Sequence, residues 1–182
     1  TRYGTVTGVQ TCALPISSKV GYLPENGPLY GDMTPRTLLQ FLGRARGLSG
    51  SELNDRIAAV VKQCALESVI GKAISKLSKG YRQRVGMAHV LLHEPDVLIM
   101  DEPTAGLDPN QIREVRQTIR RLGESKTILL STHILQEVEA VAERVVFIHE
   151  GRLVFDGSID QFKQDRDMDA QFARLTSPVG AA

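Results

Sequence analysis

The sequence has no long hydrophobic run and little net charge. No apolar stretch among its 182 residues approaches the roughly 20 residues that a membrane-spanning helix needs, so we expect any link to a membrane to come through a partner. The 22 lysines and arginines nearly balance the 21 aspartates and glutamates, which leaves a formal charge of +1. This balance argues against charge-driven binding to nucleic acid or to an anionic membrane surface, and the length allows one domain.

Cysteine is equally scarce. Cys12 and Cys64 are the two in the sequence, and Cys12 lies in a segment, residues 6–16, with neither a helical nor an alternating hydrophobic period. This segment resembles the translation of a common sequencing-library adapter. We therefore predict that residues up to about 16 are a non-native artefact rather than a signal peptide or a linker, because no basic start precedes a long apolar core. A single native cysteine cannot form an internal disulfide and is typical of a reducing, cytoplasmic setting.

The most informative feature that is present is a short apolar run ending in two acids. Residues 97–100 are apolar and predict a buried strand, which delivers Asp101 and Glu102 at its C-terminal end. In an open α/β sheet, ligands bind beyond the carboxyl ends of the strands. Asp101 would there hold a hydrated Mg²⁺, and Glu102 would orient a water. Taken alone, such a pair is more often a solvated strand-to-loop transition, so the neighbouring segments decide its interpretation.

Three further segments have the order and spacing of a known family. Leu-Ser-Lys-Gly-Tyr occupies residues 77–81, Ala-Gly-Leu-Asp occupies residues 105–108, and a second apolar strand leads to Ser-Thr-His within residues 127–133. Together with the acidic pair, these segments resemble the ATPase domain of ATP-binding cassette (ABC) proteins over about residues 20–155. The resemblance implies an α/β fold, namely a partial P-loop NTPase (ABC ATPase) domain with a mostly parallel sheet and a helical subdomain.

The resemblance also implies how the chain is organised. Residues 17–158 are expected to be the partial ATPase domain, with the helical subdomain at about 33–92. Residues 159–182 are expected to form a helical tail that either packs on the domain or meets a partner. Before the tail, two apolar runs flank Glu150 and Gly151, a turn signal that predicts an edge hairpin.

The residues that match the family's motifs take their expected roles from it. Residues 77–81 look like the family signature, commonly Leu-Ser-Gly-Gly-Gln, in which Ser78 and Gly80 are retained. Lys79 and Tyr81 depart from that pattern, and Lys79 either strengthens the attraction of phosphate or is simply solvated. In the family this segment faces ATP that is held by the opposite subunit, so the complete site exists only in a dimer.

The remaining motif residues are expected around the nucleotide. Glu102 looks like the catalytic glutamate of the Walker B strand, and His133 looks like the switch histidine, which contacts the γ-phosphate. Asp108 ends a segment that looks like the D-loop. Glu25 stands where the family's Q-loop has a glutamine; it can coordinate Mg²⁺ directly or through water, although a solvated turn residue is the alternative interpretation.

One family motif is missing from the sequence. No Gly-x-x-x-x-Gly-Lys-Ser/Thr loop, which cradles the phosphates of ATP, occurs at any position. We therefore predict that the chain is an N-terminally truncated fragment with no appreciable ATPase activity of its own. The alternative is a catalytically inert dimerisation module that supplies its signature motif in trans to a complete partner.

For the intact parent protein, the resemblance implies an ATPase that uses ATP and Mg²⁺ to drive an ABC transporter, expected to be a bacterial exporter. Its expected partners are an integral-membrane permease subunit and a second ABC ATPase subunit, in a homodimer or a heterodimer, with no nucleic acid. The expected location is the cytoplasmic face of the cell membrane. A non-transport ABC protein acting on ribosomes or DNA ranks behind, because neither a second cassette nor a basic arm is present.

Local patterns predict where several helices begin and end. Thr34 is a suitable N-cap before Pro35, and Ser78 can cap a helix that runs from about residue 79 to 93. A further helix is expected at 110–122, with Gly123 as its C-cap. The positions Leu53, Ile57, Val60 and Cys64 recur at helical spacing, so Cys64 is expected to be a core residue and not a reactive thiol.

Overall fold

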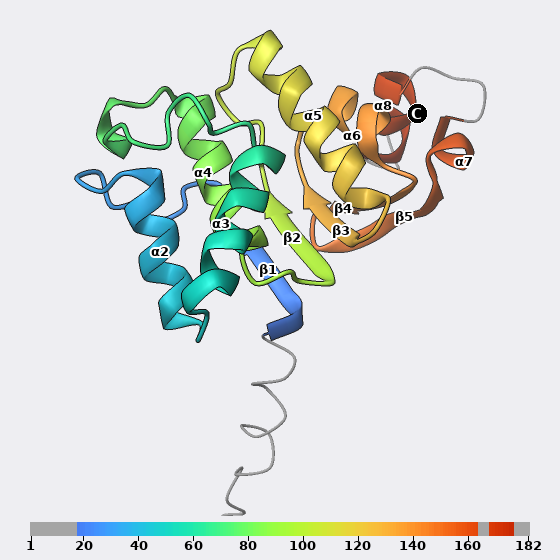
Figure 1. The fold of residues 1–182 in the computed structure, drawn as a ribbon. Coiled ribbons are helices and arrows are strands. Elements are labelled where there is room, and N and C mark those ends of the chain that lie inside the picture. Colours follow the sequence, from blue (N-terminus) through green and yellow to red (C-terminus); the bar gives the residue numbers. More distant parts are fainter. Residues whose placement is uncertain (1–17, 164–167, 177–182) are drawn as a thin grey trace, which may run out of the picture. The chain divides into compact units, whose positions relative to one another are not determined.

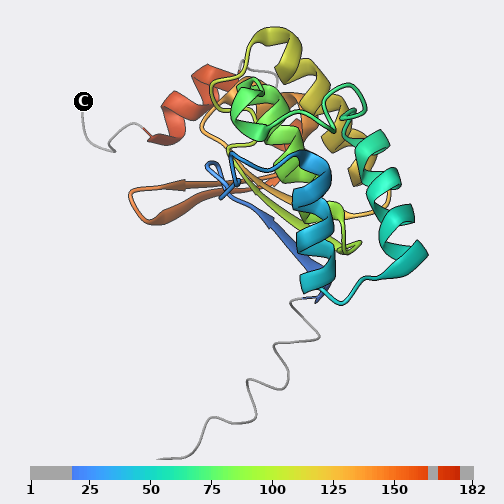
Figure 2. The same cartoon turned by 60° about the vertical axis from the view of Figure 1, so that its left-hand side comes forward.

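The computed structural model describes residues 18–163 and 168–176. The chain forms two compact units, one that ends at Ser131 and one that begins at Thr132 (Figure 1). The first unit contains a parallel sheet with helices, and the second contains a hairpin with short helices (Figure 2). Within the described residues, no helix combines the length and the apolar character needed to cross a membrane.

The sheet of the first unit consists of three parallel strands. They are β1 (Val20–Leu23), β2 (Val97–Asp101) and β3 (Thr127–Ser131), in the order β1-β2-β3. The bounds of β2 confirm the strand predicted at residues 97–100 to within one residue, and β3 lies in the segment of residues 127–133 where a second strand was predicted. Leu23 pairs with Met100, and Asp101 pairs with Ser131. Because the strands are parallel and in this register, their carboxyl ends meet at one edge of the sheet.

The two faces of this sheet differ in burial. Leu23, Leu98 and Met100 point to one face and are at most 3% exposed. Tyr22 and Leu129 point to the other face and are 55% and 61% exposed. This alternation follows from the period of two along a strand. The core of the first unit therefore lies on the Leu98 side of the sheet.

Helices α2 (Pro35–Ala45) and α3 (Gly50–Gln63) precede the short 3₁₀ helix η1 (Ile74–Lys76). Thr34 caps α2 as predicted, through a capping box with Thr37, and Pro35 is the first helical residue. The spacing argument for α3 is also confirmed, because Leu53, Ile57, Val60 and Cys64 are all between 3% and 5% exposed. Burial raises the pKa of the Cys64 thiol to about 12, which suits a core residue and not a reactive one.

Helix α4 (Lys79–Leu91) runs antiparallel to β1. A Cβ on Gly21, near the start of β1, would lie 2.5 Å from Val90, whereas one on Gly86 would lie 3.0 Å from Leu23 at the end of β1. Lys79 comes seven residues before Gly86, so at about 1.5 Å per residue α4 begins roughly 10 Å beyond that contact. The first turn of α4 therefore projects past the edge where the strands end.

Helix α5 (Pro109–Gly123) is longer than predicted by one residue at each end. The prediction that Gly123 is the C-cap is wrong. Gly123 belongs to the helix, and Glu124 caps it in a right-handed conformation, at φ −61° and ψ −25°. The backbone N–H groups of Ser125 and Lys126 then donate to the carbonyl of Leu122, so the chain turns without a left-handed glycine.

The second unit is built on a two-stranded antiparallel sheet formed by β4 (Arg144–His149) and β5 (Arg152–Ser158). Glu150 and Gly151 join the strands at φ values of 47° and 72°, as a type I′ turn requires. The predicted hairpin is therefore confirmed, although it forms a sheet of its own rather than an edge of the parallel one. The helices of this unit are α6 (Leu135–Val141), α7 (Ile159–Lys163) and α8 (Met168–Thr176).

The described part of the tail packs on this hairpin. Phe162 of α7 is fully buried, and its ring centroid lies 4.6 Å from that of Phe147 and 5.1 Å from that of Phe155. Phe172 of α8 lies 5.4 Å from Phe147. Residues 164–167 and 177–182 of the predicted tail lie outside the described residues. Between the two alternatives for residues 159–182, packing therefore applies to α7 and α8.

Candidate functional site

The carboxyl edge of the parallel sheet holds the acidic pair. Asp101 ends β2, and the hydroxyl of Ser131 at the end of β3 donates to its Oδ1. This bond fixes the orientation of the Asp101 carboxylate at the edge of the sheet. Sequence reasoning did not single out Ser131, although its place at the end of the neighbouring strand was a usable signal.

Glu102 adopts a backbone conformation that non-glycine residues rarely take. Its φ is 45°, in the left-handed region, where an L-residue costs about 1–2 kcal/mol. Two hydrogen bonds hold it there: its N–H donates to the carbonyl of Ser131 at 3.0 Å, and its carbonyl accepts from Ala105 at 3.1 Å. Such strain persists where the surroundings impose it, and it is concentrated at functional sites. The conformation turns the chain abruptly away from the direction of β2.

Glu25 reaches the same edge of the sheet from β1. It lies in an exposed turn two residues after Leu23, which pairs with Met100 next to Asp101. Glu25, Asp101 and Glu102 therefore all lie at or just after strand ends on one edge. All three are groups with carboxylate oxygens, the ligand type that Mg²⁺ prefers.

The segment of residues 77–81 starts α4. Ser78 is the N-cap, and its Oγ accepts from the N–H of Tyr81 at 3.3 Å, as expected from the sequence. The first turn of a helix presents unpaired N–H groups and a positive dipole end, which attract anions. The guanidinium of Arg82 donates to the carbonyl of Leu77 and so ties the residue before the N-cap to the first turn of the helix.

Gly80 and Lys79 contact the following loop and helix. Gly80 is buried, and a Cβ there would lie 2.6 Å from the side-chain amide carbon of Gln111. Lys79 is exposed, and its amine lies over Gly106, whose φ is 67°; a Cβ on Gly106 would be 2.4 Å from it. No sequence pattern pointed to Gln111, because its contact with Gly80 depends on how α4 and α5 cross.

Asp108 is the N-cap of α5. Its Oδ1 accepts from the N–H groups of Asn110 and Gln111, each at 3.0 Å. The side chain that the sequence assigned to nucleotide binding therefore also fixes the start of a helix. Thr104, four residues earlier, is only 2% exposed, and its carbonyl accepts from Leu107, which gives the loop of residues 104–108 a compact shape.

His133 belongs to the second unit and follows directly on Thr132. The Thr132 hydroxyl donates to Glu137 Oε2 at 3.2 Å and accepts from the N–H of Ile134 at 3.2 Å. Glu137 is 1% exposed, so a buried carboxylate anchors the segment that carries His133. Sequence reasoning missed Glu137, since a single acid on a short helix carries no recognisable pattern.

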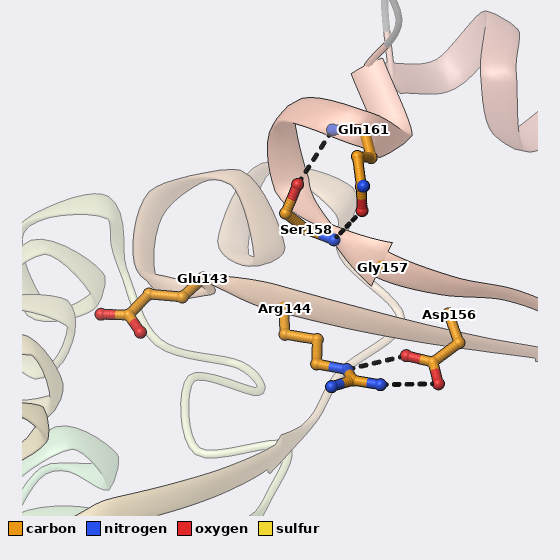
Figure 3. Close-up of a pocket in the computed structure, with 6 residues that line it drawn as sticks. All are labelled: Glu143, Arg144, Asp156, Gly157, Ser158 and Gln161. Atoms are coloured by element: carbon orange, nitrogen blue, oxygen red, sulfur yellow. Dashed lines mark hydrogen bonds and ion pairs between the residues drawn. The ribbon is translucent and has the colours of Figure 1, made fainter.

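A surface hollow of about 400 Å³ lies in the second unit (Figure 3). Arg144 and Asp156 form a two-point ion pair across its floor, at 2.8 and 2.9 Å, which lowers the pKa of the Asp156 carboxyl. Ser158 and Gln161 bond each other's backbone N–H groups at the start of α7, as in a capping box. The Glu143 carboxylate points away from the ion pair (Figure 3). Four of the six lining residues therefore pair with one another, and this hollow is a structural feature and not our candidate site.

Two histidines lie at the other end of α4. His93 Nε2 lies 3.2 Å from the carbonyl of Val20, so the neutral ring donates to it. Burial, together with the nearby charge of Arg46, lowers the pKa of both His89 and His93 below the usual 6.5. The charge of Lys126 acts on His93 in the same direction. These residues are therefore uncharged at neutral pH.

Comparison with known proteins places this arrangement in a family. The sequence profile of the family described as "ABC transporter" matches residues 6–105, more than half of the chain. The chain belongs to the ABC transporter family. This match begins within residues 1–16, whose adapter origin stays a prediction. A second profile, described as an AAA domain and putative AbiEii toxin of a type IV toxin–antitoxin system, matches residues 73–139.

Several ABC transporter proteins resemble the chain along most of its length. The ABC transporter ATP-binding protein NatA of Bacillus subtilis is 36% identical over 183 residues, which cover 96% of this chain and 73% of NatA. The bacitracin transport ATP-binding protein BcrA of Bacillus licheniformis is 36% identical, over 82% of this chain and 48% of BcrA. The Nod factor export ATP-binding protein I of Paraburkholderia xenovorans is 37% identical, over 78% of this chain and 47% of that protein. The chain thus spans about half the length of the last two relatives.

A solved structure supports the same assignment. A protein described as the ATP-binding subunit of an ABC transporter superimposes with a TM-score of 0.76 and 29% sequence identity, over 96% of this chain and 74% of that one. The fold is therefore that of a partial P-loop ABC ATPase domain, as the sequence predicted. The pairing of β1, β2 and β3 as a parallel sheet agrees with it.

Proposed function

We propose that the intact protein to which this chain belongs is the ATP-binding and ATP-hydrolysing subunit of an ABC transporter. The observation that carries the proposal is the edge where Asp101 ends β2 and Glu102 follows it, with Ser131 bonded to Asp101 and α4 beginning beyond the strand ends. Relatives whose names refer to Nod factor export and bacitracin transport favour an exporter.

The carboxylates of this edge fit a divalent cation. Asp101 offers a carboxylate that Ser131 already orients, and Glu25 offers a second at the same edge, so these two would hold Mg²⁺. Bound Mg²⁺ would neutralise charge on the phosphates of ATP. Glu102 would orient the attacking water and accept its proton, which is a general-base role. His133 would hydrogen-bond the γ-phosphate.

The start of α4 would serve the nucleotide of the opposite subunit. Ser78 caps the helix so that its remaining N–H groups point outward, which suits a phosphate. Lys79 adds a cation beside this end, and Gly80 in the same turn and Asp108 at the start of α5 would contribute to the nucleotide-facing side. This division of one site between two subunits makes a homodimer or heterodimer the working form, docked on a membrane permease at the cytoplasmic face.

The chain by itself would bind rather than hydrolyse. Residues 1–182 contain no Gly-x-x-x-x-Gly-Lys-Ser/Thr loop, so the main source of binding energy for the triphosphate is not in this sequence. We propose that the parent gene supplies that loop upstream, and that the chain as given has no appreciable ATPase activity. The second candidate is a dimerisation module that offers α4 in trans to a complete subunit.

Two experiments separate these functions. Sequencing the source DNA upstream of residue 17 should reveal an open reading frame with the phosphate-binding loop; a start codon directly before the present sequence would instead favour the module. Mixing the chain with an intact homologous subunit should give heterodimers only when ATP and Mg²⁺ are present. Heterodimers that form equally well without ATP would contradict the role in trans.

A further inference from the structure

Three contacts join the N-terminal half of α4 to α5 and to the loop before it. The Gln111 amide packs against Gly80, and the Lys79 amine lies over Gly106. One turn further along, Arg84 of α4 forms an ion pair with Glu114 of α5. All of these residues belong to the first unit, so the contacts link the segment of residues 77–81 to the loop of residues 104–108 within one compact body.

Gln111 has the central position among these contacts. Its backbone N–H donates to the Asp108 carboxylate at 3.0 Å, which ties it to the loop. Its side-chain amide reaches α4, where the carbon, oxygen and nitrogen would all lie within 3.0 Å of a Cβ on Gly80. A single residue therefore touches both segments that the proposed function aims at nucleotide.

We propose that Gln111 is a positioning residue that sets the first turn of α4 against the loop of residues 104–108, with Lys79 completing the contact over Gly106. This inference rests on the proposed function, in which both segments face ATP. A displacement of about 1 Å in a group that positions a substrate can cost roughly a hundredfold in rate. Because the two segments are packed together, a shift of one segment on binding nucleotide would displace the other.

The contact also bears on the glycine at position 80. Alanine normally stabilises a helix relative to glycine. Here an added Cβ would lie within 3.0 Å of the end of the Gln111 side chain, which must move to make room. Part of the gain from alanine is therefore offset, and the full gain should return when the Gln111 side chain is shortened.

Thermal unfolding of the full chain tests the contact. Gly80→Ala should raise Tm by about 3 °C in the Gln111→Ala background and by clearly less in the natural background. Gly123→Ala is the matched control, because Gly123 is also helical and its nearest neighbour, Ile128, lies 4.0 Å from a Cβ there. It should raise Tm in both backgrounds. An equal Tm change for Gly80→Ala in both backgrounds would overturn the contact and the inference with it.

Nucleotide-dependent association tests the positioning role. If the Gln111 contact were purely structural, Gln111→Ala would leave the ATP dependence of association unchanged. The chain is mixed with intact NatA of Bacillus subtilis, and the ATP concentration for half-maximal heterodimer formation is measured with Mg²⁺ present. Gln111→Ala should raise that concentration about tenfold, as expected for a misplaced positioning group. Gln117→Ala, an exposed glutamine on the same helix, should leave it unchanged.

The outcomes distinguish the two proposals. If Gln111→Ala and Gln117→Ala require the same ATP concentration as the unsubstituted chain, the positioning role is overturned and the proposed function stands. If the unsubstituted chain shows no ATP-dependent association at all, the role in trans is overturned, and the positioning role falls with it. In that case the Tm cycle still decides whether the Gln111 side chain restricts position 80.

Discussion

Three described glutamates have a left-handed backbone, Glu94, Glu102 and Glu150, and the last two have different reasons for it. Glu150 has a φ of 47° and stands in a two-residue hairpin turn, next to Gly151, where the turn itself demands that conformation. Glu102 has a φ of 45°, but it follows a parallel strand where no hairpin turn requires it. Hydrogen bonds to Ser131 and Ala105 impose the strain instead. The comparison suggests that strain at Glu102 positions a side chain, whereas strain at Glu150 only reverses the chain.

The largest expected effect lies at the strained strand end. Glu102→Gln in the intact protein should lower kcat by about 10²–10⁴-fold, because the amide cannot accept a proton from water. The isosteric side chain should leave ATP-dependent dimerisation in place. Steady-state ATPase assays measure the first effect, and size-exclusion chromatography with ATP measures the second. Glu150→Gln is the control, and a Glu102→Gln variant that retains most of its ATPase rate contradicts the assigned role.

The support of Asp101 by Ser131 should have the next largest effect. Ser131→Ala removes the hydroxyl that orients the carboxylate. Losing an outer partner of a metal ligand typically costs about 10–100-fold in metal affinity or activity. The Mg²⁺ concentration that half-saturates ATPase activity in the intact protein should rise accordingly. Ser125→Ala, at an exposed turn before β3, should not change it, and an unchanged Mg²⁺ requirement in Ser131→Ala would remove Asp101 from the metal site.

A pair of glycine substitutions compares the two strained positions directly. Glycine takes positive φ without the side-chain penalty, at some cost in unfolded-state entropy. Glu102→Gly and Glu150→Gly should therefore each raise the free energy of unfolding by roughly 0.5–1 kcal/mol, measured by urea denaturation of the chain. In the intact protein only Glu102→Gly should abolish turnover. A loss of stability in Glu102→Gly would mean that its side chain contributes more contacts than the strain costs.

The smallest expected effect is a pH dependence of stability from α4. His89 and His93 have pKa values below 6.5 in the folded chain, so the unfolded chain binds more protons as the pH falls through 6.5. Stability is therefore full above about pH 6.5 and declines below it, until the folded-state pKa values are reached. Both rings keep solvent contact, so each should contribute well below the ~1.4 kcal/mol per pH unit of a fully shifted group. His93→Gln should flatten the decline of Tm between pH 7 and 5, whereas an unchanged slope would exclude this histidine as a cause.

Local and periodic signals predicted much of the fold. Apolar runs and turn residues located β2, β3 and the hairpin, because these elements follow from short-range chemistry. The acidic pair was predictable, since a parallel strand brings its last residue to a known edge. The Ser131 bond to Asp101 was within reach of the same reasoning, as both residues end neighbouring strands.

Non-local contacts and backbone strain were not predictable. The Gln111 contact with Gly80 and the Lys79 contact with Gly106 depend on the angle between α4 and α5, which no single segment encodes. The left-handed backbone of Glu102 could not be predicted, because glycine and asparagine are the usual signals for positive φ and position 102 has neither. The prediction for Gly123 failed because a glycine near a helix end usually indicates a C-cap. In this chain Gly123 is the last helical residue, and Glu124 is the C-cap.

The buried thiol of Cys64 is an internal probe of local unfolding around α3. With a pKa of about 12 and 3% exposure, it is protonated and out of reach of alkylating reagents while the chain is folded. After Cys12→Ser, the rate at which Cys64 is alkylated would therefore count how often the packing between α3 and its neighbours comes apart. The substitutions above can then be ranked by the alkylation rate of Cys64, which is lower when the core opens less often. The measurement can use the same buffer as the nucleotide experiments.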